Sequence, residues 1–310
     1  GPRQLVLLSE SQYAARHKWN ETAQRDHHWP APFRHDQAIE WVLGHSFDGA
    51  RENWVPAAHC FLGYPDPLEQ GFSVPDSNGL AAGSDLDDAK WRGLMELVER
   101  DAVSIWWYNR LQRPPLRVDR SRLPQLGTFE HWIRSRNRQL WFLDLRTDVD
   151  LPVAAAVSCN MASTDFAFGF GSGWTNEMAA MNAMGELVQF EATSAMRRAD
   201  ATHGAPDFVT MASRMDVSEA PYLQPVAEAA RTSTSANFAP SALSMAQIAS
   251  RASVVDLSRD GFAVARVIVP GLRHLWPRFA AGRLYDVPVQ LGFREKATDE
   301  RQLNPSFVLY

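Results

Sequence analysis

The chain lacks several features that mark common classes of protein. It has no uninterrupted run of about 18 apolar residues, so no membrane-spanning helix is expected. Its net charge of −5 gives no electrostatic basis for binding nucleic acid or an anionic membrane. It has only two cysteines, Cys60 and Cys159, which nothing in the sequence pairs. A reducing compartment, the cytoplasm, is therefore the simpler interpretation.

The common catalytic motifs are missing as well. Neither glycine-rich segment, 79–83 or 169–173, matches a P-loop or a dinucleotide fingerprint. The serines, histidines and cysteines show no nucleophile elbow and no metal-ligand spacing. Hydrophobic content of 45% and charged content of 22% are ordinary for a globular protein with a large core. The sequence therefore indicates none of these common nucleotide-binding, nucleophilic or metal sites.

One pattern occurs twice, in residues 83–102 and again ninety positions later in 173–192. Gly83 aligns with Gly173, and Glu96-Leu97-Val98 aligns with Glu186-Leu187-Val188. Positions i, i+4 and i+7 of a helix share one face. Each copy thereby predicts a helix with a polar face, formed by Arg92, Glu96 and Glu99 in one and by Asn182, Glu186 and Gln189 in the other. The opposite face of the second helix is apolar and is expected to be buried, with Met178, Met181, Met184 and Val188.

The remaining elements alternate between strands and helices. We expect strands over 39–44, 54–58, 140–145, 152–159 and 262–269. We expect helices over 124–137, 175–198 and 245–259, and one that begins at a Ser84 or Asp85 N-cap and stops before Pro114. Residues 63–83 are predicted to be a loop with three prolines, and 166–173 a glycine-rich turn. This order favours an α/β (α+β) fold with an internal pseudo-repeat, in which two glycine turn–helix units flank a nucleotide site.

The acidic residues of the repeat predict a metal site. Glu96, Glu99 and Glu186 would repel one another if they converged without a cation. Mg²⁺ resolves the conflict because it binds carboxylate and phosphate oxygens together. A solvated helix face with an Arg92–Glu96 ion pair explains the same spacing equally well. The C-terminal region adds arginines that suit a γ-phosphate, namely Arg273, Arg278 and Arg283.

Several ordered motifs resemble those of the YcaO superfamily over about residues 37–292. They are Ser77-Asn78-Gly79-Leu80-Ala81-Ala82-Gly83, Glu96-Leu97-Val98-Glu99-Arg100-Asp101-Ala102, Ile105-Trp106-Trp107-Tyr108-Asn109-Arg110, Asn182-x3-Glu186-x2-Gln189, Val269-Pro270-Gly271-Leu272 and Arg283-Leu284-Tyr285-Asp286-Val287-Pro288. The resemblance implies a YcaO-like catalytic domain over 37–292 that binds ATP and Mg²⁺ between two pseudo-equivalent helices. Residues 1–36 would be an N-terminal extension whose Gly1-Pro2 is typical of a protease scar, and 293–310 a C-terminal tail.

The motifs most resemble those of the cyclodehydratase that modifies ribosomally made peptides. The resemblance implies that Mg²⁺ is held by Glu96, Glu99 and Glu186. It implies that the nucleotide site contains Ser77, Asn78, Glu99, Arg100, Asn182, Glu186, Gln189, Arg198, Arg278 and Arg283. The implied partners are a precursor peptide, an E1-like leader-binding protein and a flavin-dependent azoline oxidase, in a homodimer or a hetero-complex.

Two departures from the family pattern bear on this interpretation. The first helix has Gly93 where the family usually has a serine. The chain also lacks the proline-rich tail of many cyclodehydratases and ends in Tyr310, which, or whose carboxylate, is the candidate for a catalytic role there. Two alternatives therefore stay open: backbone thioamidation or amidine formation by the same activation, and a nucleotide-binding scaffold without turnover.

Overall fold

The computed structural model describes residues 3–23, 28–64, 71–73, 76–199, 215–226 and 242–306. Within these ranges the fold is mixed α and β with two antiparallel sheets, which confirms the predicted α+β class, while the pseudo-repeat around a nucleotide site stays a prediction. The chain divides into two compact units. Unit 1 comprises Gly1–Asp101 and Leu243–Asp286, and unit 2 comprises Ala102–Ala242 and Val287–Tyr310. The first division falls within helix α3, Leu86–Asn109.

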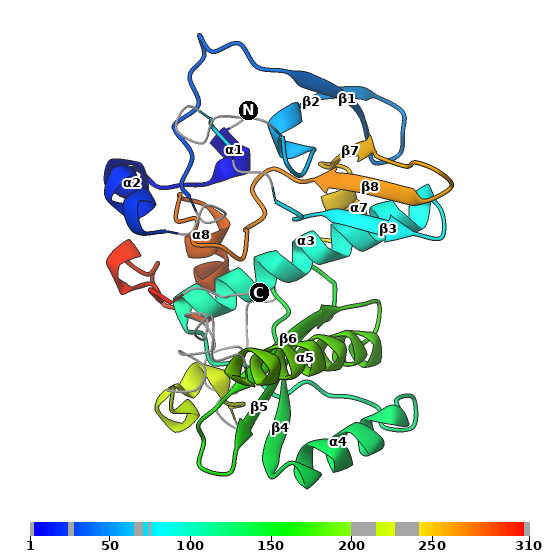
Figure 1. Ribbon diagram of the computed structural model, residues 1–310, viewed down its shortest axis with the longest axis vertical. Coiled ribbons are helices and arrows are strands. Elements are labelled where there is room, and N and C mark those ends of the chain that lie inside the picture. Colours follow the sequence, from blue (N-terminus) through cyan, green and yellow to red (C-terminus); the bar gives the residue numbers. More distant parts are fainter. Residues whose placement is uncertain are drawn as a thin grey trace. The chain divides into compact units, whose positions relative to one another are not determined.

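Unit 1 contains a five-stranded sheet in the order β2-β1-β7-β8-β3 (Figure 1). Its strands are β1 (Trp41–Ser46), β2 (Glu52–Pro56), β3 (Leu80–Gly83), β7 (Ser253–Asp256) and β8 (Ala263–Ile268). Its helical elements are α1 (Arg3–Val6), α2 (Glu10–Thr22), η2 (Ala57–His59), α7 (Met245–Ala249) and the start of α8 (Arg283–Gln290). The predicted hairpin at Asp48-Gly49 is present, and Gly49 supplies the positive φ of 75° that the turn requires.

Unit 2 contains a three-stranded sheet in the order β4-β5-β6. Its elements are α4 (Gln125–Ser135), β4 (Arg138–Asp144), β5 (Val153–Asn160), β6 (Ala167–Ser172), α5 (Asn176–Ala199) and the short 3₁₀ helices η3 (Val217–Glu219), η4 (Pro221–Leu223) and η6 (Glu300–Gln302). Helix α5 packs against β5 and β6. The aromatic core includes Trp106 and Trp107, each edge-on to Tyr222.

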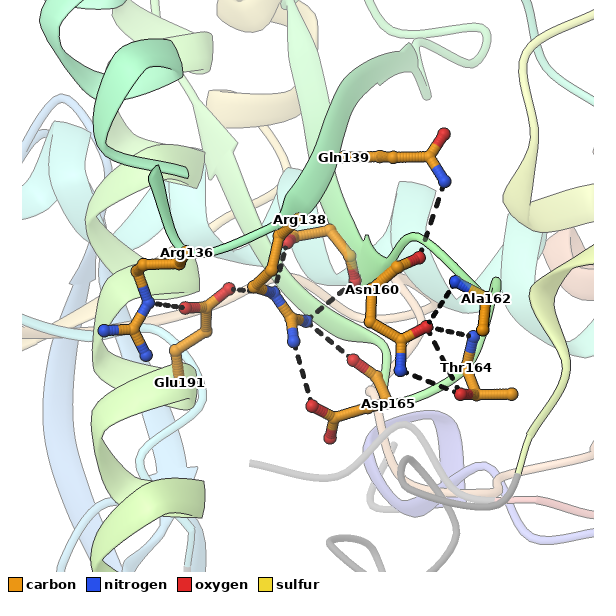
Figure 2. A network of polar contacts seen from close by, with 9 residues as sticks. Arg136, Arg138, Gln139, Asn160, Ala162, Thr164, Asp165 and Glu191 are labelled. Carbon is orange, nitrogen blue, oxygen red and sulfur yellow. Dashed lines mark hydrogen bonds and ion pairs between the residues drawn. The ribbon is translucent and has the colours of Figure 1, made fainter. Parts of the chain in front are cut away.

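An ionic network with a buried Arg138–Glu191 pair ties this sheet to α5 (Figure 2). Arg138, at the start of β4, pairs with Glu191 of α5 at 3.0 Å and with Asp165 at 2.9 Å. Its Nε also donates to Ser158 Oγ in β5. Arg136 reaches the second oxygen of Glu191 at 3.6 Å. Glu191 is only 6% exposed, and these two guanidinium groups are the ion-pair partners of its buried carboxylate.

Two predicted loops are wrong: part of 63–83 forms β3, and 166–173 is largely β6. The glycines of β6 allow a close approach of α5 rather than a turn. A Cβ at Gly169 would lie 2.2 Å from Leu187 N, and one at Gly171 would lie 2.3 Å from Ala183 N. No side chain fits in either place.

The segment 245–259 also differs from the prediction. The helix expected over 245–259 ends at Ala249, and residues Ser253–Asp256 form β7 instead. The β-branched pair Val254-Val255 suits this strand, which pairs with both β1 and β8. Helix α8, which contains Pro288, lies in a region for which no helix or strand was predicted.

The face of α5 that was expected to be buried is largely exposed. Met178, Met181 and Val188 are 44%, 43% and 37% exposed, although Met184 is buried. The sheet-facing side of α5 consists instead of small residues and one leucine, namely Ala179, Ala183 and Leu187. None of the helices in the described ranges has the length and apolar character needed to cross a membrane.

Candidate nucleotide and metal site

The first half of the candidate site lies in unit 1, on α3. Asp85 caps the helix by accepting the Asp88 N–H at 2.8 Å, as predicted for one of two candidate caps. Two turns further on, Glu96 Oε2 accepts the main-chain N–H of Gly79 at 3.0 Å. Glu99 is half-buried and lies one turn further along the same face. One oxygen of Glu96 is thus fixed by the backbone that leads into β3.

The predicted Arg92–Glu96 ion pair is wrong. Arg92 pairs with Asp88 at 2.9 Å, and Glu96 pairs with Arg100 at 2.6 Å. The Arg100 and Glu96 side chains are 21% and 24% exposed, so the pair is sheltered from water on most sides. Arg100, one of the predicted nucleotide ligands, therefore lies directly beside the first predicted metal ligand.

The second half of the candidate site lies in unit 2, on α5. Glu186 Oε2 accepts the main-chain N–H of Phe170 in β6 at 2.7 Å. Asn182 donates through Nδ2 to the carbonyl oxygen of Ser172 at 2.9 Å, and Gln189 is exposed one turn beyond Glu186. Each unit therefore presents a glutamate anchored by a main-chain N–H that lies in the strand before its helix or directly precedes that strand.

The turn before β3 holds two further predicted ligands. Ser77 is exposed, and its carbonyl oxygen accepts the Leu80 N–H at 2.9 Å. Asn78 is half-buried, and its Oδ1 is fully shielded with no hydrogen-bond partner among the described residues. A buried acceptor without a donor is costly, so this atom marks a place where a ligand donor would be stabilising. That observation fits a nucleotide at this turn.

The same turn explains the departure at Gly93. A Cβ at residue 93 would lie 2.8 Å from the carbonyl oxygen of Gly79 and 3.0 Å from Val267 Cγ2. The serine that the family usually carries at this position does not fit beside the turn as it stands in this chain. Gly79 itself has a φ of +80°, so the turn depends on glycine at both points.

The predicted arginines differ in their surroundings. Arg283 forms a bidentate ion pair with Asp101, whose side chain is fully buried; the shortest contact is 2.7 Å. Arg273 is 1% exposed and donates to the carbonyl oxygens of Arg278, Ala280 and Ala281. The Arg278 guanidinium lies 5.6 Å from the Trp276 ring centroid. Arg283 and Arg273 thus organise the loop that carries Arg278, and a direct role on phosphate stays a prediction.

Other predicted residues fall outside this description. Arg198 belongs to α5, but its side chain is not among the described ones, and Tyr310 lies beyond residue 306. In the ranges that the structure describes, no group of three or more His, Cys, Asp or Glu side chains could hold a metal ion. Glu96 and Glu99 belong to unit 1 and Glu186 to unit 2. The carboxylate donors fit Mg²⁺ in kind, and their convergence stays a prediction.

Three residues near the site were not singled out: Asp76, Asp101 and His274. Asp101 accepts the Arg273 N–H at 2.9 Å, and the neighbouring His274 contacts Asp76 at 3.1 Å. Asp76 directly precedes the Ser77–Gly83 motif, and Asp101 lies within the Glu96–Ala102 motif. Their partners lie more than 170 positions away, so no local pattern connects them.

A family model described as YcaO cyclodehydratase, ATP- and Mg²⁺-binding, matches residues 2–273. The chain belongs to the YcaO family. The predicted family and its cofactors, ATP and Mg²⁺, are confirmed by this match. Within the family, solved heterocyclases are similar to this chain over its whole length.

A heterocyclase solved in complex with substrate and cofactor covers 100% of this chain at 33% identity, with a TM-score of 0.87. The heterocyclase TruD also covers 100% of the chain, at 31% identity and a TM-score of 0.82. A YcaO protein from Methanopyrus kandleri, solved with AMPPCP and Mg²⁺, covers 78% of this chain and 67% of its own at 22% identity and a TM-score of 0.54, which shows a shared fold. The chain spans 43% and 45% of the two heterocyclase chains, less than half of either.

Proposed function

We propose that this YcaO domain activates peptide backbone amides with ATP and Mg²⁺, and that it cyclodehydrates Cys, Ser or Thr residues of a ribosomally made precursor peptide. The observation that carries the proposal is the similarity to two heterocyclases along the full chain, at 33% and 31% identity. The anchored glutamates of α3 and α5 support the same conclusion.

The proposed reaction forms a ring and removes one water from the peptide. The thiol or hydroxyl of the side chain attacks the preceding carbonyl carbon, and the proton of the nucleophile is lost. The former carbonyl oxygen takes the γ-phosphoryl group of ATP, which leaves ADP. The amide nitrogen then loses its proton as the C–O bond breaks, and a thiazoline or (methyl)oxazoline and phosphate result.

The protein's own residues contribute mainly by positioning and by charge. The main-chain N–H groups of Gly79 and Phe170 hold Glu96 and Glu186, so that these carboxylates are ordered before a ligand arrives. Bound Mg²⁺ would neutralise the phosphate charge that develops during transfer. Glu99 completes the proposed metal ligands. Asn78, Arg100, Asn182, Gln189 and Arg278 are proposed to bind the nucleotide.

We also propose that the precursor peptide is delivered by an E1-like leader-binding protein, and that a flavin-dependent oxidase acts on the azolines. A heterocyclase similar to this chain has been solved with its substrate and cofactor, which supports direct handling of the substrate by this fold. Cys60 and Cys159 are buried free thiols, as suits the reducing cytoplasm proposed here.

Mass spectrometry tests the proposal. The chain is incubated with ATP, Mg²⁺ and a candidate precursor peptide, with and without the candidate leader-binding protein, and the peptide is weighed. Loss of one water per ring supports cyclodehydration. Replacement of oxygen by sulfur, when a sulfur donor is added, would establish thioamidation instead. An unchanged peptide together with bound ATP would indicate a scaffold.

A further inference from the structure

A hydrogen-bonded cluster in unit 1 centres on Asp76, the residue before the Ser77-Asn78-Gly79 turn. Asp76 Oδ1 accepts from Arg266 Nη2 at 3.1 Å and from the Asn78 N–H at 2.8 Å. Its Oδ2 lies 3.1 Å from His274 Nε2, and its main-chain oxygen accepts from Arg266 Nη1 at 2.6 Å. The side chains of Asp76, Arg266 and His274 are all less than one-fifth exposed.

The protonation of this cluster follows from its hydrogen bonds. His274 Nδ1 accepts the Trp276 N–H at 2.9 Å, so the ring carries its proton on Nε2 and donates it to Asp76. Burial lowers the pKa of His274 against the pull of Asp76, which favours the neutral ring. Burial would raise the pKa of Asp76, but His274, Arg266 and the Asn78 N–H outweigh it and hold that pKa well below its usual range.

The cluster continues into the candidate site through the backbone. The N–H after Asn78 is that of Gly79, which donates to Glu96 Oε2 at 3.0 Å. The carbonyl oxygen of Gly79 accepts the Val267 N–H of β8 at 2.8 Å, next to Arg266. Asp76 therefore accepts the N–H of Asn78, and Glu96 accepts the N–H of the next residue, Gly79. The shielded Oδ1 belongs to Asn78, whose own N–H makes the first of these two hydrogen bonds.

We propose that His274, Asp76 and Arg266 are positioning residues that set the Ser77–Gly79 turn, and with it Glu96, for binding of Mg²⁺–nucleotide. The inference rests on the proposed function, because it assigns a purpose to residues beside the proposed site. None of the three is required to contact the nucleotide. Their effect is transmitted by the Asn78 and Gly79 N–H groups.

Two substitutions of His274 separate the donated hydrogen bond from the ring. His274→Phe keeps a flat ring beside Trp276, whose centroid lies 4.7 Å away, but loses the donor to Asp76. His274→Gln loses the ring but keeps an N–H donor on a side chain of similar reach. Asp76→Asn removes the carboxylate, and Asp260→Asn is its matched control in an exposed ion pair with Arg259.

The readouts are the dissociation constant for Mg²⁺ with a non-hydrolysable ATP analogue, by calorimetry, and the unfolding temperature of the ligand-free chain. Groups that orient ligands typically change affinity by about tenfold to a hundredfold, so we expect a loss of about tenfold for His274→Phe and Asp76→Asn. We expect His274→Gln and Asp260→Asn to bind like the wild type. A purely structural role would instead lower the unfolding temperature of His274→Phe and leave the affinity of the folded protein unchanged.

The outcomes separate the inference from the function on which it rests. Wild-type affinity in His274→Phe, or equal losses in His274→Phe and His274→Gln, overturns the positioning role while the proposed function stands. A wild-type chain that binds no Mg²⁺–nucleotide overturns both. If Asp76→Asn does not fold, the comparison of the two His274 variants still tests the positioning role.

Discussion

Glu96 and Glu186 each accept a hydrogen bond from a main-chain N–H that lies in or just before the strand preceding their helix, at 3.0 Å from Gly79 and 2.7 Å from Phe170. The two donors differ by one position from the ninety-residue register, in which Gly79 aligns with Gly169. Both helices therefore have a hydrogen bond from the main chain to the glutamate, although the donor residue is one position later in the second copy. Each carboxylate is held in place by the backbone, which is what a prepared metal ligand requires.

Substitution of Gly93 should disturb the turn that holds Glu96. Gly93→Ala places a Cβ 2.8 Å from the Gly79 oxygen, and we expect a loss of about 1–3 kcal/mol in the free energy of unfolding, with weaker binding of Mg²⁺–nucleotide. Gly127→Ala in α4 is the matched control, because nothing lies within 4 Å of its Cβ. That change should stabilise the protein by about 0.5–1 kcal/mol. Urea denaturation measures both, and equal effects would refute the steric argument.

Replacement of the Asp101 carboxylate should lower the free energy of unfolding by more than Gly93→Ala does. Asp101→Asn leaves the Arg283 guanidinium without its buried carboxylate, and breaking such a pair typically costs about 3–5 kcal/mol. Asp299→Asn is the control, since its partner Arg301 is 92% exposed, and its stability should match the wild type. The free energy of unfolding is again the measurement. A small effect at Asp101 would mean that the loop around Arg273 is held by its carbonyl contacts alone.

His59 predicts a dependence of stability on pH. Burial lowers the pKa of His59 from 6.5 to about 4 in the folded protein. Between these values only the unfolded chain takes up the proton, so the free energy of unfolding falls as the pH decreases from about 6.5 to about 4, by about 3 kcal/mol at most. Above pH 6.5 this contribution is constant. Thermal unfolding across this range should show a shallower slope in His59→Gln, and identical slopes would contradict the assignment.

Sequence reasoning succeeded where the signal was local. The helical spacing around Glu96 and Glu186 predicted α3 and α5, and Asp48-Gly49 predicted the β1–β2 hairpin. It failed where a remote partner decides the structure. Gly169 and Gly171 indicated a turn by composition, yet they are strand residues because α5 packs onto them.

In the candidate site, too, residues with a local sequence pattern were singled out and residues with remote partners were not. Glu96, Glu99, Glu186, Asn182 and Gln189 were predicted because each set repeats along one helix face, and their role as ligands stays a prediction. Asp76 and His274 were not, because 198 positions separate them in the sequence and the antiparallel pairing of β3 with β8 brings their segments together. The ion pair of Glu96 was assigned to Arg92 because i, i+4 spacing allows it, but Asp88 and Arg100 satisfy the same spacing on either side.

The proposed role of α5 in binding Mg²⁺–nucleotide is tested by the affinity of Glu186→Ala for Mg²⁺ with a non-hydrolysable ATP analogue, measured by calorimetry beside its unfolding temperature. Glu177→Ala, in the first turn of the same helix, is the control, because its carboxylate instead accepts the Asp119 N–H. We expect Glu186→Ala to lose detectable binding while it unfolds near the wild-type temperature, and Glu177→Ala to bind normally. Unchanged affinity in Glu186→Ala would contradict the assignment of α5 to the nucleotide and metal site.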